Sequence, residues 1–144
     1  MSGAGIRRDP DAGTAMMCDA VSDYRPQERA EKKIKRNTDD MTLTLVPNPD
    51  IAAALGKIKR PGQLLVGFAL ETDNEEQNAL SKMQRKNLDF IVLNSLQEPG
   101  AGVRCDTNRI TILSRDGEKQ TFGLKSKKEV AGDIVDKLIE KLHL

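Results

Sequence analysis

The sequence predicts an α/β fold, with a mostly parallel sheet, helices on both faces and an antiparallel hairpin toward the C-terminus. Apolar runs of strand length alternate with segments of helical composition, the pattern of parallel strands joined by crossover helices. The run "QLLVGFAL" (63–70) is apolar without alternation, as expected of a strand covered on both faces. An Asp-Gly pair at 116–117 lies between two further strand-like runs and is a hairpin signal.

The N-terminal third is predicted to hold two strands separated by a basic loop. Residues 1–14 are rich in Gly, Asp and Arg and are interpreted as a flexible lead-in or the remnant of something longer, so the domain is assigned to 15–144. A buried strand is expected at 15–21 and a second strand at 41–46. Between them, residues 22–40 have no apolar period and contain the lysine-rich stretch "EKKIKR".

The segment "PNPD" (47–50) predicts the start of a short helix over 50–58. Asn48 is a suitable cap and Pro49 suits the first helical position. Asp50 would lie near the positive end of the helix dipole. After this helix, a Pro-Gly pair precedes the apolar strand at 63–70.

The remaining elements follow from caps, charge and apolar spacing. A helix is expected over 72–87, capped by Thr72 or Asp73, followed by an apolar strand at 88–94. A Gly/Pro loop then leads into the hairpin strands 109–114 and 119–124. The last helix, 126–142, opens with a Ser126/Glu129 capping box. Its expected apolar stripe is Val130, Ile134, Val135, Leu138 and Leu142.

Composition excludes several classes of function. Net charge is +1 and aromatic residues are scarce, with three Phe, one Tyr and no Trp, so a base-stacking nucleic-acid binder is the least favoured interpretation. Cys18 and Cys105 lie far apart and the single histidine, His143, is nearly terminal, which argues against zinc. No apolar run is long enough for a membrane span and no signal-peptide pattern is present, so a reducing cytoplasmic compartment is the default expectation.

An anion site is the one functional hypothesis that the residues themselves support. Ligands of open α/β sheets bind beyond the carboxyl ends of the strands, where the basic loop and "PNPD" would lie. Lys82 and Lys86 share a helix face and could meet the same phosphates, although they could equally complement their own helix dipole. Phe68 follows a glycine, so a base could lie against its ring, but a core role fits it as well. The basic loop could likewise be only a solvated surface.

Six ordered segments resemble one known family. "AVSDYRP", "EKKIKR", "LTLVPNPDI", "LVGFALET", "KMQRKNLDFIVLN" and N-x-I-T-I-L, from about Ala20 onward, are similar to phosphopantothenoylcysteine synthetase, the bacterial phosphopantothenate–cysteine ligase of coenzyme A biosynthesis. The resemblance implies a Rossmann-like fold, a homodimer, and in many bacteria fusion behind a decarboxylase. It also implies that 15–144 is the C-terminal part of the ligase domain.

The chemistry that the resemblance implies uses CTP and Mg²⁺. The carboxylate of 4′-phosphopantothenate is activated as an acyl-cytidylate with release of pyrophosphate, and the amine of cysteine then displaces CMP. Lys33, in a mobile loop, would clamp the triphosphate and serve as the catalytic residue, and Asp23 would hold the nucleotide or its metal. The other implied nucleotide-binding residues are Ala20, Val21, Pro49, Asp50, Ile51, Ala52, Phe68, Lys82 and Lys86.

Two departures from the family pattern qualify this expectation. Asp19 stands where the family has a small residue beside the cytosine. The family's first half, with a Gly-rich opening, an N-x-S-S-G stretch that binds phosphopantothenate and a catalytic Asn, has no counterpart in these residues. We therefore expect a nucleotide half-site with impaired ligase activity, unless a separate chain supplies the missing half. The alternative is a truncated, non-catalytic nucleotide-binding or dimerisation module of the same fold.

Overall fold

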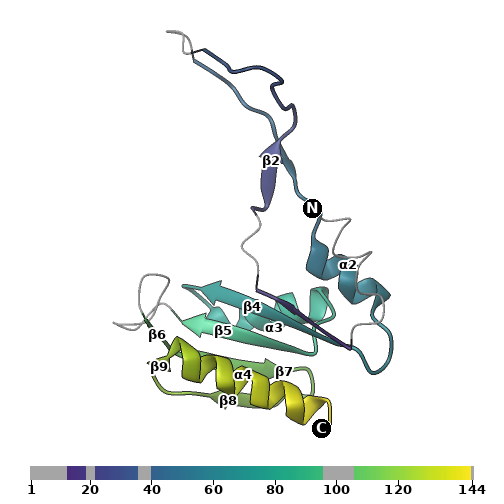
Figure 1. Cartoon of the computed structure of the whole chain (residues 1–144), viewed down its shortest axis with the longest axis vertical. Helices are drawn as coiled ribbons and strands as arrows, with labels where there is room; N and C mark the ends of the chain where they lie inside the picture. The colour runs from purple at the N-terminus through teal and green to yellow at the C-terminus, as the bar shows by residue number, and fades with distance from the viewer. Residues whose placement is uncertain (1–12, 19–21, 36–39, 96–105, 144) are drawn as a thin grey trace. The chain divides into compact units, whose positions relative to one another are not determined.

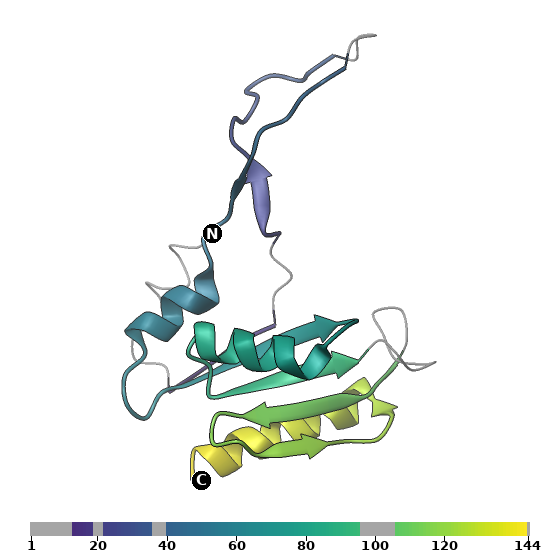
Figure 2. The ribbon, with the colours of Figure 1, turned by 180° about the vertical axis from the view of Figure 1, so that it is seen from behind.

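The computed structural model describes residues 13–18, 22–35, 40–95 and 106–143, and the chain forms two units (Figures 1 and 2). The sheet unit comprises Met1–Cys18 and Ile51–Leu144. The ribbon unit comprises Asp19–Asp50. Each unit is described separately below.

A five-stranded sheet with the order β1-β4-β5-β7-β8 forms the centre of the sheet unit. Its strands are β1 (Thr14–Met17), β4 (Leu64–Glu71), β5 (Phe90–Ser95), β7 (Ile110–Ser114) and β8 (Lys119–Thr121). The pairs β1–β4 and β4–β5 are parallel, while β5–β7 and β7–β8 are antiparallel. The predicted parallel core with a C-terminal hairpin is therefore confirmed.

Helices cover both faces of this sheet, as predicted. In Figure 2, α3 (Glu75–Arg85) lies in front of β4 and β5, whereas α4 (Lys127–Lys141) lies on the opposite side. The strands alternate inward and outward, so two separate cores result. One core contains Leu65, Ala69, Ala79, Met83, Leu88, Ile91, Leu93 and Leu113, with Leu55 of α2 (Ile51–Ile58) packed against it. The other contains Val66, Phe90, Val92, Ile110, Ile112, Val130 and Ile134.

A group of side-chain hydrogen bonds joins the amino ends of β4 and β5. The carboxylate Oδ2 of Asp89 accepts from the backbone N of Leu65 and from Nζ of Lys59, both at 2.7 Å. Asn87, in the left-handed region at φ 56°, donates its side-chain amide to the carbonyl of Gly56 at 2.6 Å. Because these bonds require one particular alignment of the chain, they fix the register of β4 against β5 and hold the end of α2.

In the ribbon unit, the predictions of a loop over 22–40 and of a main-sheet strand over 41–46 are partly wrong. β2 (Tyr24–Pro26) pairs antiparallel with β3 (Leu45–Pro47), so part of the expected loop is a strand and the predicted strand 41–46 is not in the main sheet. The alternation in "MTLTLV" is typical of a strand with one exposed face, and a sequence pattern does not reveal its pairing partner. Met41, Leu43 and Leu45 are all exposed.

Several element boundaries also differ from those predicted. β1 ends at Met17, and residues 19–21 of the expected strand lie outside the described residues. The N-cap of α3 is Asn74, rather than Thr72 or Asp73; it has φ 45° and makes no side-chain cap hydrogen bond. A small pair, β6 (Thr107–Asn108) with β9 (Lys125–Ser126), was not predicted.

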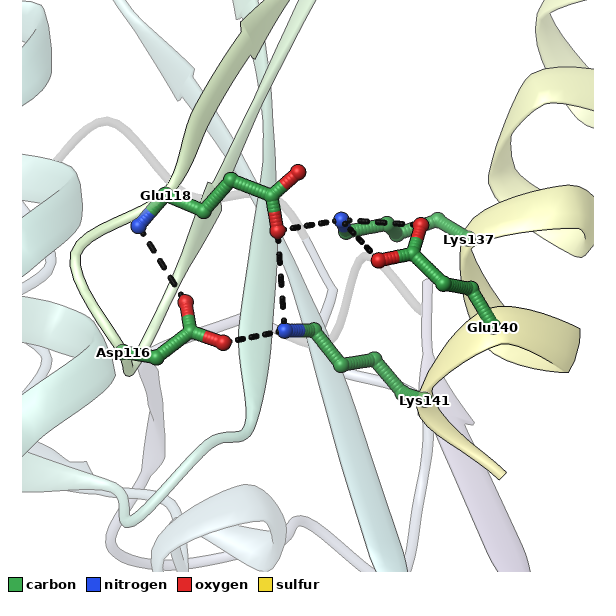
Figure 3. A network of polar contacts seen from close by, with 5 residues as sticks. All are labelled: Asp116, Glu118, Lys137, Glu140 and Lys141. Atoms are coloured by element: carbon green, nitrogen blue, oxygen red, sulfur yellow. Dashed lines mark hydrogen bonds and ion pairs between the residues drawn. The ribbon is translucent and has the colours of Figure 1, made fainter. Parts of the chain in front are cut away.

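The predicted apolar stripe of α4 is wrong at one residue, Val135. Val135 is 44% exposed, whereas Lys137 is only 2% exposed. The reason is that the β7–β8 turn supplies carboxylates to this side of the helix (Figure 3). Nζ of Lys137 donates to Glu118 at 2.6 Å and to Glu140 at 3.1 Å, and Lys141 pairs with Asp116 and Glu118.

These contacts set the pKa values of the network. Burial acts to lower the pKa of Lys137, but hydrogen bonds to Glu118 and Glu140 outweigh it, so that the net pKa is raised. The hydrogen bond from Lys137 lowers the pKa of Glu118, and the hydrogen bond from Lys141 lowers that of Asp116. Lys137, Glu118 and Asp116 are therefore held in their charged forms.

The capping box of α4 is present as predicted and supports a first test. The hydroxyl of Ser126 donates to Glu129 at 2.6 Å, and Oε2 of Glu129 also accepts the backbone N of Ser126 at 3.0 Å. The pKa of Glu129 is lowered by these bonds, so its contribution to stability is present above pH 4.5 and is lost as the pH falls.

We expect Ser126→Ala to cost about 1 kcal/mol in the free energy of unfolding. Denaturant titration at pH 7 and pH 3 should show a smaller cost at pH 3, and an equal cost at both would contradict the cap assignment.

Candidate functional site

The carboxyl-terminal half of β4 brings together two of the predicted site residues. β1 pairs with β4 as far as Met17 with Gly67, and β4 continues beyond this point to Glu71. At the first residue past the last β1 pair, the ammonium of Lys82 donates to the carbonyl of Phe68 at 2.8 Å. Lys82 comes from α3 on one face of the sheet, and the half-buried ring of Phe68 packs on the core of the other face. The cation of Lys82 is thus held at the backbone of Phe68, while the ring of Phe68 lies on the other face of the sheet.

Lys86 lies at the other end of the same helical stripe. It is the C-cap of α3, and its backbone N donates to Lys82 and Gln84. Since α3 runs from the end of β4 back to the start of β5, Lys86 is one turn farther from the carboxyl edge than Lys82. Its carbonyl faces Gly56 of α2. Lys82 therefore lies in α3 and Lys86 just beyond its last residue, and a phosphate shared by the two lysines remains a prediction.

The first turn of α2 supplies Ile51 and Ala52, which are both half-buried. Pro49 and Asp50 precede the helix, so the expectation that Pro49 is its first residue is wrong. No acidic side chain lies within this first turn, although Asp50 directly precedes it.

The expected cap, Asn48, makes different contacts within the ribbon unit. Its side chain accepts from Arg25 at 3.1 Å and donates to the carbonyl of Ser22 at 2.6 Å, and its backbone N donates to Asp23 at 2.7 Å. Arg25 also donates to the carbonyl of Pro47 at 2.9 Å. Asn48 thus ties the β2 and β3 segments together at the place where the chain leaves toward α2.

Sequence reasoning missed Arg25 as a positioning residue. Its only signal was its place inside "SDYRP", one of the segments that carry the family resemblance. The predicted ligands Asp23 and Lys33 are exposed in the ribbon unit. Ala20 and Val21, together with the departure at Asp19, lie outside the described residues.

The described residues lack two kinds of feature. In this part of the chain, no cluster of three or more His, Cys, Asp or Glu side chains has the arrangement of a metal site. No helix there has the length and apolarity needed to cross a bilayer.

Curated proteins similar to this chain include a decarboxylase and proteins of coenzyme A biosynthesis. A cysteine/cysteine sulfinic acid decarboxylase from an unknown prokaryotic organism is 50% identical over 143 residues, which are 99% of this chain and 40% of that protein. The coenzyme A biosynthesis bifunctional protein CoaBC of Haemophilus influenzae is 41% identical over 124 residues, 86% of this chain and 30% of that protein. The chain therefore spans less than half the length of these relatives.

Solved structures show the same fold. The crystal structure of the C-terminal domain of CoaBC has a TM-score of 0.77 at 30% identity, and the match covers 99% of this chain and 61% of that one. The DNA/pantothenate metabolism flavoprotein from Streptococcus pneumoniae has a TM-score of 0.67 at 25% identity, covering 95% and 64%. These likenesses confirm both the fold predicted from the sequence pattern and the family resemblance.

The sequence model of one family, the DNA/pantothenate metabolism flavoprotein C-terminal domain, matches residues 1–142. This match covers nearly the whole chain and agrees with the fold and with the CoaBC relatives. The chain therefore belongs to the DNA/pantothenate metabolism flavoprotein C-terminal domain family and corresponds to the phosphopantothenoylcysteine synthetase part of the CoaBC proteins.

Proposed function

We propose that this chain binds CTP with Mg²⁺ and forms the nucleotide half-site of a phosphopantothenate–cysteine ligase. The observation that carries the proposal is the contact between Lys82 and the carbonyl of Phe68, at the carboxyl-terminal half of β4. Both residues lie in segments that resemble the ligase, "LVGFALET" and "KMQRKNLDFIVLN". The substrates of the complete reaction would be 4′-phosphopantothenate, cysteine and CTP.

Each group has a physical role in this proposal. The carbonyl of Phe68 orients the ammonium of Lys82, and the ring of Phe68 offers an apolar surface for cytosine. Backbone N–H groups at Ile51 and Ala52 would meet phosphate oxygens, since a helix N-terminus favours negative charge. Concentrated positive charge would stabilise the departing pyrophosphate. The family resemblance adds Ala20, Val21, Asp23, Lys33, Pro49, Asp50 and Lys86 as further nucleotide ligands.

The residues present are compatible with Mg²⁺ that arrives with the nucleotide. Magnesium in nucleotide sites is usually held by one or two carboxylates together with phosphate oxygens, so a protein cage is not required. Asp23 is exposed, and its backbone carbonyl accepts from Asn48 in the "PNPD" segment. When bound, the ion would neutralise phosphate charge, and Asp23 would supply a carboxylate oxygen to it.

Binding and chemistry are tested separately. Isothermal titration with CTP and Mg²⁺ tests the nucleotide half-site, and release of pyrophosphate after addition of 4′-phosphopantothenate tests activation. We expect saturable CTP binding that Phe68→Ala and Lys82→Ala both weaken. Ala substitution of the exposed lysine Lys128, on the α4 side of the sheet, is the control and should change nothing. Absence of CTP binding would overturn the proposal, whereas binding without pyrophosphate release would limit it to a half-site.

The second candidate is a non-catalytic module of the same fold, which would act as a homodimerisation or docking unit for a decarboxylase in the cytoplasm. It is favoured by the 50% identical relative, which is named as a decarboxylase and of which the chain spans 40%. The same titration separates the two candidates, because a module of this kind needs no affinity for CTP.

Lys33 and Lys32 provide a matched pair for the ribbon unit. Both are exposed lysines of the "EKKIKR" segment, and only Lys33 is implied as a phosphate ligand. Losing one charge-assisted contact should cost Lys33→Ala about 1.5–3 kcal/mol, or roughly 10- to 150-fold in CTP affinity. Lys32→Ala should bind like the parent, and both variants should unfold within about 0.5 kcal/mol of it. Parallel losses of affinity in the two variants would reduce the segment to a general basic surface.

A further inference from the structure

The base of the ribbon unit is held by hydrogen bonds rather than by a hydrophobic core. Among the described residues of this unit, 22–35 and 40–50, only Val46 and Asn48 are not exposed. The pairing of β2 with β3 covers three residues on each strand, and a two-stranded ribbon of this kind is only marginally stable by itself. Side-chain hydrogen bonds therefore have to fix the geometry of the base.

Asn48 is at the centre of these hydrogen bonds. Its backbone N donates to the carbonyl of Asp23 at 2.7 Å, and its side-chain amide donates to the carbonyl of Ser22 at 2.6 Å. Its side-chain oxygen accepts from Nη1 of Arg25 at 3.1 Å, and the same nitrogen donates to the carbonyl of Pro47 at 2.9 Å. We call these four hydrogen bonds the Arg25–Asn48 bracket.

The bracket fixes the backbone on both sides of the Asp23 side chain. The carbonyl of Ser22 lies just before the Cα of Asp23 and the carbonyl of Asp23 just after it, and both accept from Asn48. The exposed carboxylate of Asp23 therefore starts from a backbone with a defined place relative to Asn48. Without the bracket, ordering this backbone when a ligand binds would cost conformational entropy.

We propose that Arg25 and Asn48 are positioning residues for the magnesium ion of the bound nucleotide, and that they act through Asp23. The inference rests on the proposed function, in which Asp23 supplies a carboxylate oxygen to the Mg²⁺ that arrives with CTP. Groups that orient a metal-binding side chain commonly contribute about 10- to 100-fold to metal affinity or activity. The bracket would contribute in this way because it presents Asp23 before the ion arrives.

A bracket with a purely structural role would have a different signature. If Arg25 and Asn48 only kept the ribbon folded, their loss would weaken CTP binding by the same factor with and without Mg²⁺. If they act through Asp23, the loss of affinity appears only when Mg²⁺ is present. It also disappears when the carboxylate of Asp23 has already been removed.

The test measures CTP affinity by isothermal titration, once with Mg²⁺ and once with EDTA. We expect Arg25→Ala and Asp23→Asn each to weaken binding roughly 10- to 100-fold in Mg²⁺ and to bind like the parent in EDTA. The double variant should bind no more weakly than Asp23→Asn, because a residue that acts through another is not additive with it. Arg29→Ala is the matched control, since Arg29 is an exposed arginine of the same unit outside the bracket. It should keep the parent's ratio of affinities with and without Mg²⁺.

Hydrogen exchange without nucleotide provides a second readout. The amide of Asn48, which donates to Asp23, should exchange more slowly in the parent than in Arg25→Ala. Equal exchange in the two proteins would overturn the proposal.

Two titration results would also overturn the proposal while leaving the proposed function intact. One is a loss of affinity in Arg25→Ala that is equal with and without Mg²⁺, and the other is additive losses in the double variant. A parent chain that does not bind CTP would overturn the proposed function and this inference together, and the parent's own titration identifies that case.

Discussion

Replacing Gly56 by alanine should lower the free energy of unfolding by roughly 3 kcal/mol, and the melting temperature by about 6–12 °C. A methyl group at this position would overlap the carbonyl oxygen of Lys86, and would lie 2.9 Å from its carbonyl carbon and 3.0 Å from Cβ of Asn87. These atoms belong to the end of α3 and are fixed by helix hydrogen bonds and by the bond from Asn87 to Gly56. Because neither the backbone of Gly56 nor that of Lys86 can shift without breaking hydrogen bonds, α2 would have to move away from α3.

Gly132 is the matched control for this substitution. It also lies inside a helix, α4, but a methyl group there would meet no atom within 4 Å. Gly132→Ala should therefore raise stability by about 0.5–1 kcal/mol, which is the difference in helix propensity between the two residues. Thermal melts of both variants decide the question. Equal effects of one sign would show that propensity alone governs both positions and that the α2–α3 contact is loose.

Removing the acidic partners of Lys137 should destabilise the protein more than removing the lysine itself. Lys137 is 2% exposed and depends on Glu118 and Glu140 for its charge, while both carboxylates are partly in water. Lys137→Met keeps most of the volume and leaves only carboxylates that water can solvate, so we expect a loss within about 1.5 kcal/mol. The double change Glu118→Gln and Glu140→Gln leaves a buried, unpaired ammonium, whose desolvation should cost several kcal/mol.

The pH dependence of stability provides an independent check of this network. The pKa of Lys137 is raised above 10.5, so its contribution is complete below that value and is lost as the pH rises further. The pKa of Glu118 is lowered mainly by the hydrogen bond from Lys137 and acts in the opposite sense, so its contribution is lost as the pH falls below 4.5. The stability of Lys137→Met should therefore respond less to pH at both extremes than the parent does. If the double variant is as stable as Lys137→Met at pH 7, the ammonium is hydrated and the burial argument fails.

Local signals explain which parts of the fold could be predicted. Strands β4 and β5 were identified because an uninterrupted apolar run has few alternatives to a strand buried on both faces. The Asp-Gly turn and the Ser126/Glu129 box were identified because each acts within a few residues. The pairing of β3 with β2 was missed because strand pairing is non-local, and alternation in "MTLTLV" shows only that one face of the strand is exposed. Lys137 was missed because its burial depends on Glu118, which the hairpin brings to α4.

The candidate site shows the same division. A helix start near Ile51 followed from the local cap pattern, although Asn48 proved to hold the ribbon instead. The contact of Lys82 with Phe68 joins α3 to β4. From residue type alone, Lys82 could only complement its helix dipole, and Phe68 could only be a core residue. Only the family resemblance selected them together. Arg25 escaped notice because a single arginine between Tyr24 and Pro26 has no distinctive spacing.

β1 and β4 are neighbours in the sheet but far apart in the sequence, and this separation determines the order in which the strands assemble. β4, α3 and β5 are consecutive, so their pairing closes a short loop, whereas β1 can pair with β4 only after all of 18–63 has been looped out. Each doubling of loop length adds roughly 0.6 kcal/mol of closure entropy, and β1 offers only four residues of pairing in return. β1 should therefore join the folding nucleus last and detach first. The amide of Leu64, bonded to Gly13, should exchange with solvent through this detachment, while the amide of Asp89, bonded to Leu65, should wait for global unfolding. The edge strand is thus a separate cooperative unit within a single sheet.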